Sequence, residues 1–143
     1  MGRIEVEHTF AAPREKVWSR YTDHAGWTDW AGAGTVWLER EGEPHRDGVG
    51  CVRVIANPGV RVREEVIAFE PPERMVYRLI GGPVPMTNHE GEVRFEDLGG
   101  STRLVWRVRF DGTLPGSTWV LERGLPLLFR RILRRLGKTL QRS

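Results

Sequence analysis

Residues 117–141 read STWVLERGLPLLFRRILRRLGKTLQ, and this stretch decides the fold. Apolar residues recur in it at spacings of three and four, and on a helix they fill one arc of roughly 140°. They are Leu121, Leu125, Leu128, Phe129, Ile132, Leu133, Leu136 and Leu140. An apolar stripe this wide needs a broad surface to lie on, and a β-sheet supplies one. We therefore expect a long amphipathic helix packed on a sheet, with Pro126 kinking it or splitting it near Gly124.

The chain before this helix alternates between short apolar runs and turn residues. Strands are predicted at 3–10, 35–40, 50–56, 60–69, 75–80, 89–96 and 102–110. Two short helices follow the first strand, one over 13–21 and a second that Asp23 caps and that ends near Trp30. Short turns between successive strands favour antiparallel pairing. The predicted fold class is α+β: a curved antiparallel sheet of about seven strands wrapped around the C-terminal helix, in one domain over residues 1–143.

Basic residues are concentrated near the C-terminus. The chain carries a net charge of +3, and residues 130–143 hold six of its 22 Lys and Arg and none of its 19 Asp and Glu. The rest of the chain is slightly acidic, so no nucleic-acid partner is expected. The basic helix face has three interpretations: it is solvated, it lies on an anionic membrane surface, or it contacts an acidic partner. Its residues are Arg130, Arg131, Arg134, Arg135 and Lys138.

Several classes of site find no support in the residues. Cys51 is the only cysteine, so the chain has no internal disulfide and no cysteine metal cluster. The four histidines do not stand at metal-ligand spacing, and no nucleophile elbow is present, so we expect neither a metal nor a cofactor. The N-terminus lacks a signal-peptide core and no apolar run reaches membrane-spanning length. The expectation is a soluble cytoplasmic protein, a monomer or a weak dimer.

Arg53 and Glu64 are predicted to face each other across a hairpin. A two-residue turn at Pro58-Gly59 pairs Asn57 with Val60, and the same register pairs Arg53 with Glu64. This register places a charge pair in the middle of an otherwise apolar face. Such a pair can polarise or protonate a ligand carbonyl or anchor a polar end; a purely structural or surface cross-strand pair is the other interpretation.

A register shifted by one residue remains open. It would place Val52 opposite Glu64, and Arg53 opposite Arg63. We prefer the first register because like charges directly opposite each other are unfavourable.

Aromatic and polar residues complete the candidate site. Trp27, Trp30 and Trp119 are predicted to flank the ends of a cavity, and Trp106 to point inward, although each tryptophan also suits a plain core. The predicted ligand-binding residues are Trp27, Trp30, Arg53, Glu64, Val66, Tyr77, Met86, His89, Trp106, Val108, Trp119, Leu125 and Phe129. The candidate acid–base groups are Glu64, Arg53, Tyr77 and His89, with a core tyrosine as the other interpretation of Tyr77.

Six local motifs carry a resemblance to a known superfamily. They are AAPREKVW (11–18), Asp23 with Trp27 and Trp30, GCVR (50–53), REEV (63–66), FEPP (69–72) and GSTRLVW (100–106). With the order of elements, they make nearly the whole chain resemble the helix-grip fold of the START-like, Bet v 1-like superfamily, in its bacterial polyketide cyclase/dehydrase-like branch. These motifs are turns and core positions, so they identify the fold better than an activity. The resemblance implies an apolar ligand between sheet and helix.

Two functions from different classes follow. The first is a non-catalytic carrier or sensor of a hydrophobic or amphipathic small molecule. The second is a cyclase or dehydratase acting on a polyketide-like carbonyl compound through Glu64 and Arg53. The candidate acid–base groups form no recognised triad, so binding is the preferred hypothesis.

Overall fold

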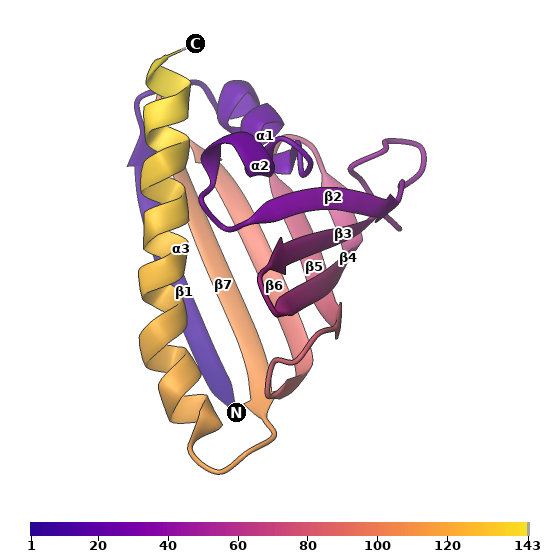
Figure 1. The fold of residues 1–143 in the computed structure, drawn as a ribbon. Helices are drawn as coiled ribbons and strands as arrows, with labels where there is room; N and C mark the ends of the chain where they lie inside the picture. Colours follow the sequence, from indigo (N-terminus) through magenta and orange to yellow (C-terminus); the bar gives the residue numbers. More distant parts are fainter. Residues whose placement is uncertain (143) are drawn as a thin grey trace.

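The computed structural model describes residues 1–142. Seven strands form one antiparallel sheet in the order β1-β7-β6-β5-β4-β3-β2. They are β1 (Gly2–Phe10), β2 (Thr35–Arg40), β3 (Val52–Asn57), β4 (Val60–Glu70), β5 (Arg74–Gly81), β6 (Met86–Asp97) and β7 (Thr102–Gly112). The sheet curves around α3 (Ser117–Gln141), and α1 (Arg14–Thr22) and α2 (Trp27–Trp30) cover one end of it (Figure 1). This is the predicted α+β helix-grip fold.

Local sequence explains the short helices. Pro13 directly precedes α1, where its missing N–H is not needed. Asp23 then accepts a hydrogen bond from the backbone N–H of Gly26 at 3.3 Å, in the turn that leads into α2. Trp27 of α2 is buried and donates through Nε1 to the backbone oxygen of Tyr21 at 2.7 Å, which ties the two helices together.

The long helix is not split. It runs unbroken from Ser117 to Gln141 with Pro126 inside it, so the predicted break near Gly124 is wrong. Pro126 lacks the N–H that would bond to the carbonyl of Glu122, and its ring crowds that carbonyl. Leu125 and Phe129 on either side of it pack against the core, and these contacts hold the helix together across that position.

The two halves of α3 meet the sheet differently. Ile132, Leu133, Leu136 and Leu140 in the C-terminal half are buried in the core. In the N-terminal half the same apolar arc is only partly covered, and Leu128 remains 39% exposed. The helix therefore closes the core at one end and leaves space above the sheet at the other.

The β3–β4 hairpin has the preferred register. Asn57 pairs with Val60 and Arg53 pairs with Glu64, so the shifted register is wrong. Because the side chains of a strand alternate between the two faces, this register directs both charges to the same side of the sheet.

Strand β6 is longer than predicted and irregular at its start. It begins at Met86, inside the segment expected to be a loop, and a bulge interrupts its pairing with β7 between Thr87 and Glu90. Asn88 in this bulge has a φ of 51°, in the left-handed region. Bulges redirect neighbouring side chains, and His89 is the residue next to it.

Candidate functional site

A cavity of about 330 Å³ lies between the sheet and the N-terminal half of α3. Its wall is mostly apolar, and ten of the predicted ligand-binding residues line it. These are Trp27, Arg53, Glu64, Tyr77, Met86, His89, Trp106, Val108, Leu125 and Phe129. The volume lies within the range of small-molecule pockets, roughly 300–1,000 Å³.

Arg53 is the most unusual group in this wall. Its side chain is 1% exposed, and both Nε and Nη2 lie 2.9 Å from Oε1 of Glu64, whose side chain is 12% exposed. Both contacts use one carboxylate oxygen, so Oε2 of Glu64 is not engaged by the arginine. The predicted pair is thus present in the cavity wall.

Aromatic rings enclose the Arg53 guanidinium. Its central carbon lies 5.0 Å from the centroid of Trp27 and 4.7 Å from that of Tyr77, distances at which a cation is attracted to a ring face. Burial is the largest single effect and lowers the pKa of Arg53, but the charge of Glu64, the two tyrosines Tyr21 and Tyr77 and the hydrogen bond to Glu64 together raise it, and the net pKa lies above its ordinary value. The site therefore holds a permanent buried positive charge.

His24 supports Arg53 and was missed by the sequence reasoning. It is fully buried; its Nε2 lies 3.2 Å from the backbone oxygen of Asp47 and its Nδ1 lies 3.3 Å from Nη1 of Arg53. A carbonyl can only accept, so Nε2 carries the proton and Nδ1 accepts from the arginine. Burial, and then the charge of Arg53, hold the pKa of His24 well below its usual range, which keeps it neutral. A lone histidine in a polar loop has no periodicity that would reveal this role.

Tyr77 joins the pair to the aromatic floor of the cavity. Its hydroxyl accepts a hydrogen bond from Nε1 of Trp106 at 2.8 Å, and Trp106 stacks on Phe129 of α3 with centroids 4.2 Å apart. Gly91 makes this position possible, because a Cβ there would lie 2.3 Å from the Tyr77 ring. Burial raises the pKa of Tyr77 well above its usual range, so the hydroxyl keeps its proton and can donate it to an acceptor.

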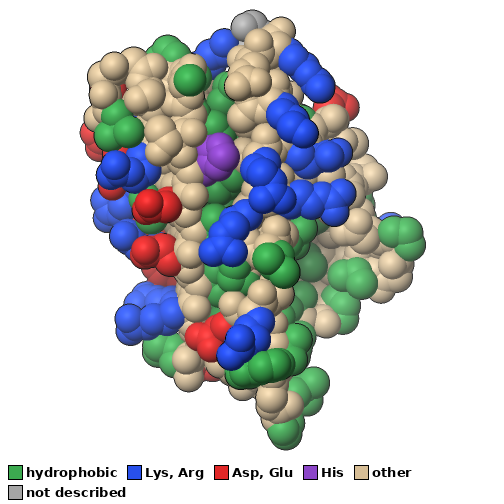
Figure 2. Space-filling model, turned by 90° about the vertical axis from the view of Figure 1, so that its left-hand side faces the viewer, with side chains coloured by type: hydrophobic (Ala, Val, Ile, Leu, Met, Phe, Trp, Pro, Cys, Tyr) green, Lys and Arg blue, Asp and Glu red, His purple; other side chains and the backbone are tan. Residues whose placement is uncertain are grey.

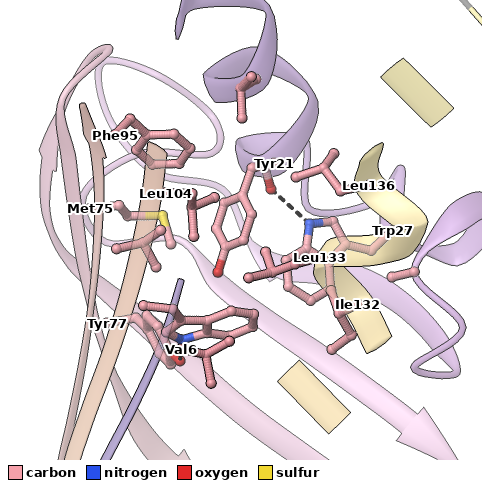
Figure 3. Packing of buried hydrophobic residues seen from close by; sticks show 14 of the residues in the cluster. Val6, Tyr21, Trp27, Met75, Tyr77, Phe95, Leu104, Ile132, Leu133 and Leu136 are labelled. Atoms are coloured by element: carbon pink, nitrogen blue, oxygen red, sulfur yellow. Dashed lines mark hydrogen bonds between the residues drawn. The ribbon is translucent and has the colours of Figure 1, made fainter. Parts of the chain in front are cut away.

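Tyr21 is a second buried tyrosine that the sequence reasoning missed. Its ring lies edge-on to Trp106, 5.6 Å between centroids, and its hydroxyl makes no hydrogen bond within residues 1–142. In Figure 3 this hydroxyl points away from α1 and toward the side of the core where Tyr77 lies. Burial raises the pKa of Tyr21, and the nearby charge of Arg53 partly offsets this effect.

His89 occupies a position where the β5–β6 ladder ends. The backbone N–H of Leu79 donates to Nδ1 of His89 at 2.9 Å, so the neutral ring carries its proton on Nε2. Burial lowers the pKa of His89 below its usual value, although the charge of Glu64 opposes this shift. The neutral imidazole therefore brings an N–H donor to the cavity wall.

Three residues of the predicted ligand-binding set do not line the cavity. Val66 is buried in the core cluster. Trp30 packs on Trp27, 5.4 Å between centroids, behind the wall. Trp119 is 60% exposed, so its expected place at a cavity end is wrong. Its position on α3 lies roughly 140° around the helix from Ile132, outside the arc that faces the sheet.

Other kinds of site were sought in residues 1–142. No group of three or more His, Cys, Asp and Glu side chains there is arranged to hold a metal ion. Cys51 is buried, and burial raises the pKa of its thiol to about 11, which disfavours a reactive thiolate. Among the described helices, none has the length and apolar character needed to cross a bilayer.

Solved structures with the same fold include proteins of known and unknown activity. A START superfamily protein from Mycobacterium smegmatis has a TM-score of 0.83 at 15% identity, covering 99% of both chains. The Zhui aromatase/cyclase from Streptomyces sp. R1128 has a TM-score of 0.79 at 20% identity, covering 98% of this chain and 93% of that one. A protein from Thermobifida fusca has a TM-score of 0.81 at 25% identity, covering 99% and 95%.

Sequence comparison gives the family. None of the curated proteins searched matches the chain. The profile of one family, described as polyketide cyclase/dehydrase and lipid transport, matches residues 1–141. That span is nearly the whole chain, and the fold agrees with it. The chain therefore belongs to the polyketide cyclase/dehydrase and lipid transport family.

Proposed function

We propose that this protein binds a hydrophobic or amphipathic small molecule, lipid-like or polyketide-like, in the cavity between the sheet and α3. The observation that carries the proposal is a buried Arg53–Glu64 pair in an otherwise apolar wall. A charged pair in such a wall is costly unless it is fully hydrogen-bonded. A protein with apolar residues of similar size at these positions is often at least as stable. Its presence therefore supports a role toward a ligand.

The donors in the wall suit a ligand with an oxygen acceptor at one end. Arg53 has five N–H groups, and its contacts with Glu64 and His24 leave part of this capacity for a ligand. The Nε2–H of His89 and the O–H of Tyr77 line the same cavity. A carbonyl, phenol or carboxylate oxygen would meet these donors, while the rest of the ligand would contact Trp106, Val108 and Leu125.

Ligand capture and cavity filling test the proposal together. Protein purified under native conditions should release a small molecule on denaturation, identified by mass spectrometry. Leu125→Trp should fill the cavity and abolish retention, because Leu125 lines it. Leu127→Trp is the matched control, because Leu127 is two positions away on the same helix and exposed. The cavity is not a ligand site if the native protein releases no small molecule and binds none of an added series of fatty acids and hydroxynaphthoates. It is also not a ligand site if the two variants retain a small molecule equally.

An enzymatic role of the cyclase or dehydratase type is the second candidate. It is favoured by the convergence of Glu64, Arg53, Tyr77 and His89 on one cavity. Arg53 would stabilise the negative charge that develops on a carbonyl oxygen, and the free oxygen of Glu64 would take a proton from the adjacent carbon. The enolate would then form the carbon–carbon double bond and expel the β-hydroxyl group, which would leave as water with the proton held by Glu64, and the carboxylate would be restored. Incubation with a β-hydroxy ketone probe separates the two functions. Turnover that Glu64→Gln removes, with binding retained, would establish the enzyme; recovery of unchanged probe supports the carrier.

A further inference from the structure

The arginines of this protein fall into two groups. Most of those on the sheet have carboxylate partners: for example, Arg74 and Arg94 pair with Glu92, Arg107 pairs with Glu5, and Arg109 pairs with Glu90. On α3, the exposed side chains of Arg130, Arg131, Arg134 and Lys138 take part in none of the ion pairs formed within residues 1–142. The unpaired positive charge is therefore concentrated on the outward side of α3. We call this side, which carries Arg130, Arg131, Arg134 and Lys138, the outer helix face.

Large apolar side chains continue this face toward the N-terminus of α3. Trp119, Val120 and Leu127 are 60%, 58% and 66% exposed. Val120 and Leu127 are seven residues apart and share a side of the helix with Arg131 and Arg134. Arg123 lies between them, and its guanidinium carbon is 4.4 Å from the Trp119 ring centroid. Figure 2 shows Lys and Arg side chains gathered on the upper part of this side of the molecule and hydrophobic side chains below them.

The mouth of the cavity lies beside this apolar end. Leu128 directly follows Leu127, lines the cavity and is 39% exposed. Val60, at the start of β4, also lines the cavity and is 41% exposed. An apolar path therefore connects the outer helix face to the interior.

We propose that the outer helix face docks the protein on the surface of an anionic lipid bilayer. The Arg and Lys side chains would contact lipid phosphates, and Trp119, Val120 and Leu127 would enter the interface, where tryptophan is favoured. The apolar arc of α3 is already used by the sheet, so docking is peripheral and reversible. The cavity mouth would then open at the source of an amphipathic ligand.

Other occupants fit this surface less well. A second copy docked through the same face would bring two unpaired basic clusters together. Nucleic acid or an acidic protein segment would match the arginines but would leave Val120 and Leu127 without an apolar partner. The interface of an anionic bilayer offers phosphates to the basic side chains and an apolar environment to Val120 and Leu127.

Vesicle co-sedimentation of the full chain tests this docking. We expect binding to phosphatidylcholine vesicles that contain about 30% phosphatidylglycerol, no binding to pure phosphatidylcholine, and loss of binding at high salt. The triple variant Arg130→Gln/Arg131→Gln/Arg134→Gln should bind on the order of 100-fold more weakly. The matched control Arg94→Gln/Arg103→Gln/Arg109→Gln removes the same charge from the sheet and should bind like the wild type.

The apolar half of the face has its own variant. Val120→Ser/Leu127→Ser should weaken vesicle binding roughly tenfold, and Trp119→Phe should remove a blue shift of the fluorescence seen with anionic vesicles. The proposal is overturned if the control triple variant weakens binding as much as the helix variant. It is also overturned if the serine variant binds vesicles as the wild type does. A third contrary result would be a short DNA duplex that binds the protein as tightly as the vesicles do and is weakened equally by the helix triple variant and by the serine variant. Ligand retention in the cavity is measured separately, so its failure would not affect this result.

Discussion

Arg53 illustrates how one buried charge shapes its surroundings. Glu64 neutralises it, Trp27 and Tyr77 cover its faces, and neutral His24 accepts a hydrogen bond from it. Each contact depends on the others: a protonated His24 would repel the guanidinium, and removal of Arg53 would leave Glu64 in an apolar wall. Together these contacts position the guanidinium in the cavity wall.

A double-mutant cycle measures the coupling of Arg53 and Glu64. Arg53→Leu should lower the free energy of unfolding by on the order of 3 kcal/mol, because it leaves a carboxylate without its partner. Arg53→Leu combined with Glu64→Leu should cost clearly less than the two single variants together. Urea denaturation of all four proteins gives these values.

The exposed pair of Arg63 and Glu39 is the control for this cycle. Its side chains are 41% and 44% exposed, so solvent screening should make its coupling much weaker than that of the buried pair. If the costs of the two Arg53 and Glu64 variants simply add, the pair is not coupled. If the double Leu variant folds and retains ligand normally, the pair is structural only.

At the scale of elements, α3 combines a continuous apolar stripe with two residues that disfavour a helix. Gly124 and Pro126 both disfavour a helix, yet the element continues through them. Its apolar side chains pack on the sheet and compensate for the unfavourable local preferences, as tertiary contacts commonly do. The weak segment lies where α3 spans the cavity, so the part of the helix with the least core packing also borders the ligand site.

Gly124→Ala should stabilise the protein by about 1 kcal/mol, the usual difference between the two residues in a helix. Gly124 is exposed, and a Cβ there would have no atom within 4 Å. Gly116→Ala is the matched control: its Cβ position is equally open, but its φ of 78° is left-handed, so the substitution should destabilise the protein. Thermal unfolding compares the two, and a loss of stability in Gly124→Ala would show that its backbone is not an ordinary helical one.

For the whole molecule, one buried and two partly buried histidines predict a dependence of stability on pH. Burial is the main cause that lowers the pKa values of His8, His24 and His89 in the folded protein. Below about pH 6.5 the unfolded chain therefore takes up protons that the folded protein does not. The free energy of unfolding is highest above that pH and falls as the pH is lowered, by up to about 1.4 kcal/mol per pH unit for the fully buried His24.

His24→Gln isolates the largest of these contributions. Glutamine does not titrate, so the variant should lose less stability than the wild type between about pH 6.5 and pH 5, a window above the range of ordinary carboxylates. Urea denaturation at several pH values gives, for the wild type and for the variant, the slope of the free energy of unfolding against pH. The comparison of slopes does not depend on the stability of the variant at neutral pH. Equal slopes would mean that His24 is protonated in the folded state.

The sequence by itself determined the order of the elements and the register of one hairpin. Strand alternation and the three-four spacing of α3 are local signals, and they predicted all seven strands and three helices to within a few residues. The two-residue turn at Pro58-Gly59 and the unfavourable pairing of Arg53 with Arg63 in the shifted register both favoured Arg53 opposite Glu64, so the key contact of the site was predictable from the chain.

Tertiary structure alone decided the remaining features of the site. His24 reaches Arg53 from 29 residues away through a loop without periodicity, and Tyr21 enters the core from α1. Trp119 turned outward and Pro126 did not break α3, because packing on the sheet sets the rotation and continuity of that helix. Local patterns determine which face of an element is apolar; only the packing of all elements together determines which polar groups that face encloses and where space remains between them.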